Sequence, residues 1–242
     1  MLSKKELKDI QSLSQKKFRD QLKLFIAEGP KIVEELIELI PDQFEKIYAV
    51  KEWIETRKSL VQTIELKEVS DAELDKLSQL QTPNQVIAVV RKNNPNTVDA
   101  SLFTLYLDTI QDPGNFGTII RIADWFGIKD IVCSSGCVDV YNPKVIQSTM
   151  ASIARVNVFY DQNDDWLNNQ TETVFAATLD GTMLYEHSKI EKGILIIGNE
   201  SKGIRPEILQ YANEKITIPK KGGADSLNAA VATGIMVSHL LN

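Results

Sequence analysis

The chain has 242 residues, of which 43% are hydrophobic and 25% charged, a composition typical of soluble globular proteins. No apolar run approaches the roughly 20 residues of a membrane-spanning helix, and the first residues lack the apolar core of a secretory signal, so we expect a cytoplasmic protein without a membrane segment. The formal net charge of −6 argues mildly against a nucleic-acid partner, because Lys and Arg drive binding to phosphates. Cys133 and Cys137 match neither a zinc pair nor a redox pair, so we expect reduced, buried thiols and no metal site.

The first 25 residues are basic within this acidic chain. They contain seven basic side chains against three acidic ones. Such a segment either forms the solvated face of a helix or belongs to a surface that faces RNA, and composition does not distinguish the two.

Residues 1–92 predict a small α/β domain. Pro30 suits the start of a helix whose apolar residues recur at helical spacing over 32–40. Residues 44–50 and 85–90 predict strands, and Ser70 with Glu73 forms a capping-box pattern before another helix. The Asn- and Pro-rich stretch that follows predicts a linker at 93–99.

Residues 100–242 predict an α/β domain with an open parallel sheet. Short apolar runs without strict alternation are typical of strands that are buried on both faces. The predicted strands are 102–107, 130–133, 174–177, 194–197 and 215–218. The predicted helices are 117–126, 143–153, 206–211 and 226–241. Ligands bind such sheets at the carboxyl ends of the strands, so the loops there are the candidate site.

The loop after the first of these strands carries Asn115 and, six residues later, Arg121. Residues six apart lie on different faces of a helix, so both can act only if Asn115 lies in the loop or the first turn. Alternatively, Asn115 is a plain helix cap and Arg121 a solvated helix residue.

Two further loops follow predicted strands. The first contains Gly198, Asn199, Glu200 and Gly203 in an order that is neither a Walker loop nor a dinucleotide fingerprint, and a left-handed turn also accounts for it. The second contains Ser226, the predicted N-cap of a helix made largely of small apolar residues. That helix packs either at a subunit interface or as an ordinary buried terminal helix. All three loops can converge on one edge of the sheet.

The three motifs, in this order, resemble the SpoU family of RNA ribose 2′-O-methyltransferases, which is TrmH-like and lies within the SPOUT superfamily. The resemblance covers roughly 100–242, and 1–92 looks more loosely like the RNA-binding domain that precedes the catalytic domain in several members. The matching residues are Asn115, Gly117, Arg121, Phe126 and Gly127 in the first motif, Gly198, Asn199, Glu200 and Gly203 in the second, and Ile218, Pro219, Ser226, Leu227, Asn228, Ala232 and Gly234 in the third. Departures from the family pattern at Ile122, Thr149, Ala151, Lys220, Ala229 and Ala230 remove no catalytic side chain and concern the choice of substrate.

The resemblance implies a deep trefoil knot in the C-terminal domain, a homodimer formed through that domain, and S-adenosylmethionine as the cofactor. By the same resemblance, the polar residues of the family's active site correspond to Asn115, Arg121, Glu200, Ser226 and Asn228. The resemblance also carries over cofactor contacts at Gly198, Ile218 and Leu227, with Asn199 and Thr178 as further lining. The implied substrate is structured RNA, ribosomal rather than transfer RNA because a separate N-terminal domain is present. The placement of charge, rather than the resemblance, predicts that RNA meets the basic segment 1–25 together with Lys202, Arg205, Lys220 and Lys221.

The resemblance leaves the role of Arg121 open between two chemistries. The family's matching arginine is proposed as the base that removes the proton of the ribose hydroxyl. An arginine side chain has an ordinary pKa above about 12, so removing its proton near pH 7 costs on the order of 7 kcal/mol. The alternative is a charged clamp on the target phosphate, with Glu200 or water as the proton acceptor.

Other functions remain open at this point. They are transfer RNA as the substrate, drug resistance through modification of the ribosome, and a catalytically silent RNA-binding homologue. A nucleotide-binding oxidoreductase is disfavoured because no GxGxxG turn follows the first strand.

Overall fold

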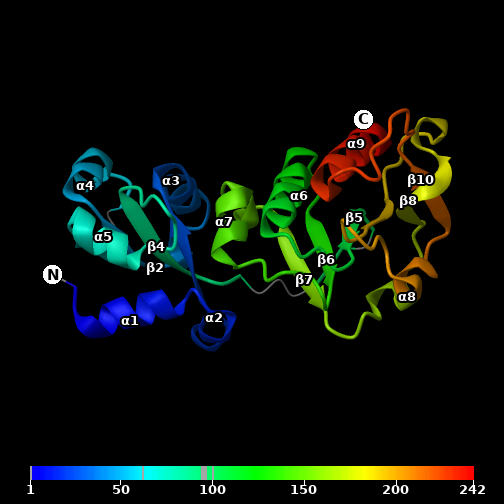
Figure 1. Ribbon diagram of the computed structural model, residues 1–242. Coiled ribbons are helices and arrows are strands. Elements are labelled where there is room, and N and C mark those ends of the chain that lie inside the picture. Colours follow the sequence, from blue (N-terminus) through cyan, green and yellow to red (C-terminus); the bar gives the residue numbers. More distant parts are fainter. Residues whose placement is uncertain (1, 62, 94–96, 100) are drawn as a thin grey trace. The chain divides into compact units, whose positions relative to one another are not determined.

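The computed structural model describes residues 2–61, 63–93, 97–99 and 101–242 (Figure 1). Part of the predicted linker, residues 94–96, therefore lies outside the described residues. The chain forms two compact units, Met1–Asn94 with Asp139–Ala154, and Pro95–Val138 with Arg155–Asn242. Asp139–Ala154 thus packs with the N-terminal residues although it lies within the predicted domain 100–242, and the division of the chain into functional domains stays a prediction.

The first unit is a mixed sheet with helices on its faces (Figure 1). Its strands are β1 Leu24–Glu28, β2 Phe44–Ala49, β3 Leu66–Glu68 and β4 Val86–Arg91, in the order β1-β4-β2-β3. Its helices are α1 Lys4–Ser12, α2 Lys16–Leu22, α3 Pro30–Leu39, α4 Lys51–Arg57, α5 Asp71–Leu77 and α7 Pro143–Thr149, with 3-10 turns η1 Pro41–Gln43 and η2 Ser152–Ala154. The predicted helix start at Pro30 and the capping box of Ser70 with Glu73 are confirmed. The sequence did not reveal β1, β3 or a second capping box, formed by Ser3 and Glu6.

The inserted segment Asp139–Ala154 is fastened to the first unit by polar and aromatic contacts. α7 packs on β1, and the ring of Tyr141 lies 4.9 Å from that of Phe25. The Tyr141 hydroxyl donates to the Asn93 carbonyl at 2.8 Å. Arg19, whose side chain is only 2% exposed, forms an ion pair with Asp139. The segment therefore contributes to the core of this unit.

The second unit is a six-stranded sheet in which every pair of neighbouring strands is parallel. Its strands are β5 Phe103–Leu107, β6 Asp130–Ser134, β7 Asn157–Asp161, β8 Val174–Met183, β9 Gly193–Ile197 and β10 Glu214–Thr217, in the order β10-β8-β9-β5-β6-β7. Its helices are α6 Pro113–Trp125, α8 Pro206–Leu209 and α9 Ala229–Leu241, with η3 Trp166–Asn169 and η4 Leu184–Glu186. Every residue of β5, β6 and β9 is buried, as predicted for strands covered on both faces.

The strand order reverses beside β5, and this reversal defines where a ligand can bind. From β5 the chain moves outward through β6 and β7, and then crosses to the other side for β8, β9 and β10. The crevice at such a switch point, beyond the carboxyl ends of the strands, is the usual ligand site of an open parallel sheet. The predicted α/β class with a parallel C-terminal sheet is confirmed, whereas the trefoil knot stays a prediction.

Three properties of the described residues bear on the expectations above. No helix among them is long and apolar enough to cross a membrane. They contain no group of three or more His, Cys, Asp or Glu side chains that could hold a metal ion. Both cysteines are free and Cys133 is buried, as expected, but the expectation of a buried thiol is wrong for Cys137, which is partly exposed.

Candidate active site

The ends of β5 and β9 place the first two predicted loops side by side. Leu107 pairs with Ile197 at the last position of both strands, and the Asp108 amide donates to the Ile197 carbonyl at 2.8 Å. The loops that start at Asp108 and Gly198 therefore leave the sheet from adjacent points.

The first loop ends in a capped helix start that fixes Asn115. Asp112 is the N-cap of α6, and its carboxylate accepts from the Asn115 amide at 2.7 Å. Pro113 occupies the first turn, where its missing N–H costs nothing. The helix therefore begins at Pro113, four residues before the predicted start. Asn115 lies in the first turn, as a joint role with Arg121 requires.

The Asn115 side chain joins the three motifs in one hydrogen-bonded network. Its Nδ2 donates to Glu200 Oε1 at 2.6 Å, and its Oδ1 accepts from Asn228 Nδ2 at 2.7 Å. These residues are 85 and 113 positions away from Asn115 in the sequence. A carboxylate and two amides so arranged can hold a hydroxyl or a phosphate at a defined place.

The third motif caps α9 through Asn228. The Oδ1 of Asn228 accepts from the amides of Ala230 at 3.0 Å and Val231 at 3.2 Å. The prediction that Ser226 is the N-cap is wrong. Asn and Ser are comparable caps, and Asn228 has the further bond to Asn115 that orients its side chain. Ser226 is exposed two residues before the cap.

Arg121 does not reach this network within the unit. It is exposed on α6 and forms no hydrogen bond or ion pair with any residue that the structure describes. Six residues of helix turn its side chain away from that of Asn115. Its place in the site stays a prediction.

The second loop is a tight turn that glycine makes feasible. The amide of Asn199 donates to the carbonyl of Gly203 at 3.0 Å, and the amide of Gly203 returns a bond of 2.9 Å. A Cβ on Gly198 would lie 2.4 Å from the Gly203 carbonyl carbon, and Gly203 has a φ of +69°. Any larger side chain at Gly198 would displace the backbone. The left-handed turn suggested as an alternative is thus present, and it carries Glu200.

The predicted cofactor contacts follow the same edge of the sheet. Thr178 lies two residues beyond Ala176, which pairs with Ile196, and Gly198 lies two residues beyond Ile196. Ile218 follows β10 and is half-buried, while Leu227 is 46% exposed. Leu227 thus offers an exposed apolar side chain and the loops offer backbone polar groups, which are the features that a site for a nucleoside-type cofactor needs.

Arg205, which was expected to face RNA, is bound within the fold instead. Its guanidinium contacts Asp108 at 2.7 Å and Asp164 at 2.9 Å. Its charge is compensated there, whereas Lys202, Lys220 and Lys221 are exposed. No local pattern predicts this ion pair, because Asp108 and Arg205 are 97 residues apart.

A groove of about 1400 Å³ lies between α6 and α9. Asn115 and Asn228 line it, together with Ile122, Val231 and Ile235. The site is therefore continuous with an open surface that is partly apolar.

Comparison with known proteins assigns the family. The model of the SpoU rRNA methylase family matches residues 102–238, and that of the MRM3-like substrate-binding domain matches 4–88. The chain belongs to the SpoU rRNA methylase family. The family resemblance stated from the three motifs is confirmed.

Relatives of this SpoU-family chain extend along most of its length. The 23S rRNA (guanosine(2553)-2′-O)-methyltransferase RlmP of Bacillus subtilis is 31% identical over 97% of this chain and 95% of its own. The 23S rRNA (uridine(2479)-2′-O)-methyltransferase of Streptomyces viridochromogenes is 27% identical over 74% of this chain and 69% of its own.

Solved structures match the whole chain. A Porphyromonas gingivalis protein assigned to the TrmH family of RNA methyltransferases has a TM-score of 0.87 and 33% identity, covering 100% of this chain and 98% of that one. The AdoMet-bound rRNA methyltransferase of Sinorhizobium meliloti has a TM-score of 0.86 and 28% identity, covering 100% and 97%.

Proposed function

We propose that this protein transfers the methyl group of S-adenosylmethionine to a ribose 2′-hydroxyl of ribosomal RNA. The observation that carries the proposal is the network in which Asn115 joins Glu200 and Asn228 at the switch point of the sheet. The relatives that match nearly the whole chain favour ribosomal over transfer RNA, since RlmP acts on 23S rRNA. A silent homologue is disfavoured because the polar side chains of all three motifs are present.

The cofactor supplies an electrophilic methyl group, and the residues of this chain prepare the ribose oxygen that attacks it. The bond from Asn115 occupies Oε1 of Glu200, which leaves Oε2 as an acceptor for the proton of the 2′-hydroxyl. Asn228 orients Asn115 from the other side. We assign Arg121 the role of a charged clamp on the target phosphate, because a guanidinium carries a positive charge at neutral pH and loses its proton only at high cost.

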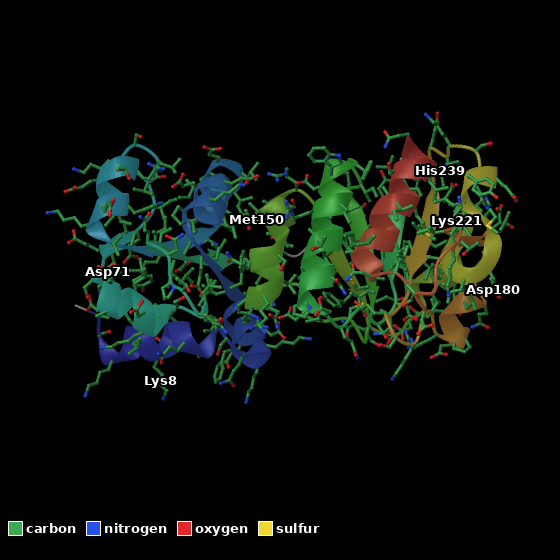
Figure 2. The ribbon with its side chains drawn as sticks, turned by 45° about the horizontal axis from the view of Figure 1, so that its top comes forward. Lys8, Asp71, Met150, Asp180, Lys221 and His239 are labelled. Atoms are coloured by element: carbon green, nitrogen blue, oxygen red, sulfur yellow. The ribbon has the colours of Figure 1, made fainter. Side chains whose placement is uncertain are left out.

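RNA would bind the N-terminal unit at a surface that we call the lysine surface, made of exposed side chains of α1, α2 and the residue after α2. Its members are Lys4, Lys5, Lys8, Lys16, Lys17 and Lys23. None of them forms an ion pair with a described residue. In contrast, Lys67 pairs with Glu6 and Lys92 with Asp20 inside the fold. Figure 2 shows Lys8 extending away from α1. Cations without internal partners are available to neutralise phosphates.

The exposed face of α6 and α9 would be covered by a second copy of the chain. Trp125 is 84% exposed at the end of α6, and Val231 and Ile235 on α9 are 51% and 41% exposed. α6 and α9 pack side by side, and Val231 and Ile235 line the groove between them, while Trp125 is the neighbour in sequence of Phe126, another groove residue (Figure 1). Contiguous exposed apolar residues mark an interaction surface. Arg121 lies one turn before Trp125, so a partner on this face would also cover the arginine.

Methyl transfer can be tested with tritiated S-adenosylmethionine, ribosomal RNA from a strain that lacks the gene, and transfer RNA from the same strain. We expect incorporation into ribosomal RNA alone, at one ribose that methylation mapping finds unmodified in that strain. Incorporation confined to transfer RNA would overturn the choice of substrate. The absence of incorporation into either RNA, with cofactor bound, would overturn the proposed activity.

A further inference from the structure

Asp108 lies directly after β5 and is fully buried, with 0% of its side chain exposed. Among the described residues, Arg205 alone supplies hydrogen-bond donors to this carboxylate. The Arg205 amide donates to Oδ2 at 2.8 Å, Nε donates to Oδ1 at 2.8 Å, and Nη2 lies 2.7 Å from Oδ1. A buried carboxylate of this kind is stable only with a cation and several donors around it.

Asp108 and the next residue, Thr109, hold both ends of the loop that carries Glu200. At the start of the loop, Asn199 Nδ2 donates to the Thr109 carbonyl at 2.9 Å. At its end, Arg205 binds Asp108. Thr109 adopts a φ of +54°, a conformation that is costly for a β-branched residue, and its amide donates to Ser134 Oγ at 2.9 Å. The loop is therefore anchored twice to one strand end.

The same strand end also sets the place of Asn115. Asp112, four residues after Asp108, caps α6 and holds Asn115 in its first turn. Glu200 and Asn115 are thus both positioned from the end of β5, one through the loop anchors and the other through the helix cap. The 2.6 Å bond between them requires that both anchors hold.

We infer that Asp108 and Arg205 are positioning residues that fix the end of the loop so that the Glu200 carboxylate meets Asn115 and the ribose hydroxyl. The inference rests on the proposed methyl transfer. Asp164 reinforces the arrangement, since it accepts from Arg205 and from the amide of Ser135 at 2.9 Å each. Glu207 also contacts Arg205, at 3.5 Å, but is 59% exposed and adds little.

The test compares Arg205→Lys with Glu207→Gln in the full-length protein. A lysine keeps the charge but cannot donate through two guanidinium nitrogens. We expect Arg205→Lys to lower kcat about tenfold at saturating RNA and cofactor, and to change the Kd for S-adenosylmethionine less than threefold. In the free protein, hydrogen–deuterium exchange of the backbone amides of Asn199 and Gly203, which bond to each other's carbonyls, should become about tenfold faster. Glu207→Gln should change none of these quantities.

A second comparison separates positioning from general weakening of the fold. In a Glu200→Gln background, assayed by single turnover, Arg205→Lys should lower the rate less than twofold, because the carboxylate that it positions is already gone. An equal loss in both backgrounds, or a loss of kcat without faster exchange in the loop, would overturn the inference. If Arg205→Lys does not fold, Asp164→Asn takes its place, with an expected loss of about threefold. If the unaltered protein methylates no RNA, the proposed function fails, whereas amide exchange still tests the anchoring.

Discussion

Breaking the buried ion pair between Arg19 and Asp139 should be one of the more costly single changes in the first unit. The two side chains are 2% and 10% exposed, and Arg19 Nε donates to Asp139 Oδ2 at 3.0 Å. Arg19 Nη1 also donates to the carbonyls of Leu13 and Ser14, at 2.8 and 2.9 Å, which joins the end of α1 to the inserted segment. Arg19→Met removes this donor from the two carbonyls and removes the cation from the Asp139 carboxylate, which keeps only the bond from the Tyr141 amide at 3.3 Å among the described residues.

Breaking one side of a buried ion pair costs about 3–5 kcal/mol, since the remaining charge stays in an apolar environment. At roughly 2–4 °C per kcal/mol for a chain of this size, the melting temperature should fall by on the order of 10 °C. The matched control is Arg91→Met, because Arg91 pairs with Glu45 in a bridge that is 52% and 53% exposed. Such a bridge contributes about 0–1 kcal/mol.

Urea unfolding followed by circular dichroism measures the free energy of unfolding of both variants. The double variant Arg19→Met with Asp139→Leu should recover part of the loss, because it removes the unpaired carboxylate but not the two unpaired carbonyls. Equal costs for Arg19→Met and Arg91→Met would refute the reasoning, and so would a double variant that is as unstable as the sum of its single variants.

Four further outcomes follow from the site, the proposed dimer and the basic N-terminus. Asn115→Ala should lower methyl transfer at least about a hundredfold while calorimetry finds cofactor binding nearly unchanged, since it removes a polar group rather than loop backbone. Arg121→Lys should retain substantial transfer at neutral pH if the residue is a charge clamp; a loss as complete as that of Arg121→Ala would favour guanidinium-specific chemistry. Trp125→Asp should yield a monomer in light scattering, because it places a charge on the exposed apolar face. The Lys67 ammonium, followed by the Ser3 amide, lowers the pKa of Glu6 from 4.5 to about 2. The folded pKa lies below the unfolded one, so this stabilisation is present above pH 4.5 and is lost as the pH falls toward 2. Glu6→Gln should therefore flatten the acid limb of the stability curve, and an unchanged limb would contradict this.

Local signals predicted the elements and part of the site. Buried apolar runs located β5, β6 and β9 to within a residue or two. The start of α6 was misplaced although Asp112-Pro113 is a readable cap followed by proline, because the apolar pattern begins only at Phe116. β1 and β7 were missed because neither reads as an isolated apolar run: only Lys23 separates β1 from α2, and β7 has the polar residues Asn157 and Asp161 at its two ends.

Contacts between distant residues were beyond sequence reasoning. No periodicity shows that Asp139–Ala154 packs with residues 1–94, because the segment reads as one more helix between two strands of the parallel sheet. Nor does any local pattern pair Arg205 with Asp108. As an isolated loop residue, Arg205 looked like a cation available to RNA, and only the fold shows that its charge is already compensated.

The register of β5 against β9 determines whether the candidate site exists at all. Leu107 pairs with Ile197, so the residues after each strand diverge from neighbouring points and return to meet at Asn115 and Glu200. A slip of one residue would move Asp108 by about 3.3 Å along the strand and turn its side chain to the opposite face of the sheet. Arg205 would then have no buried partner, and the loop would lose its anchor. The buried apolar side chains that lock this register, among them the paired Leu105 and Leu195, therefore support the polar site.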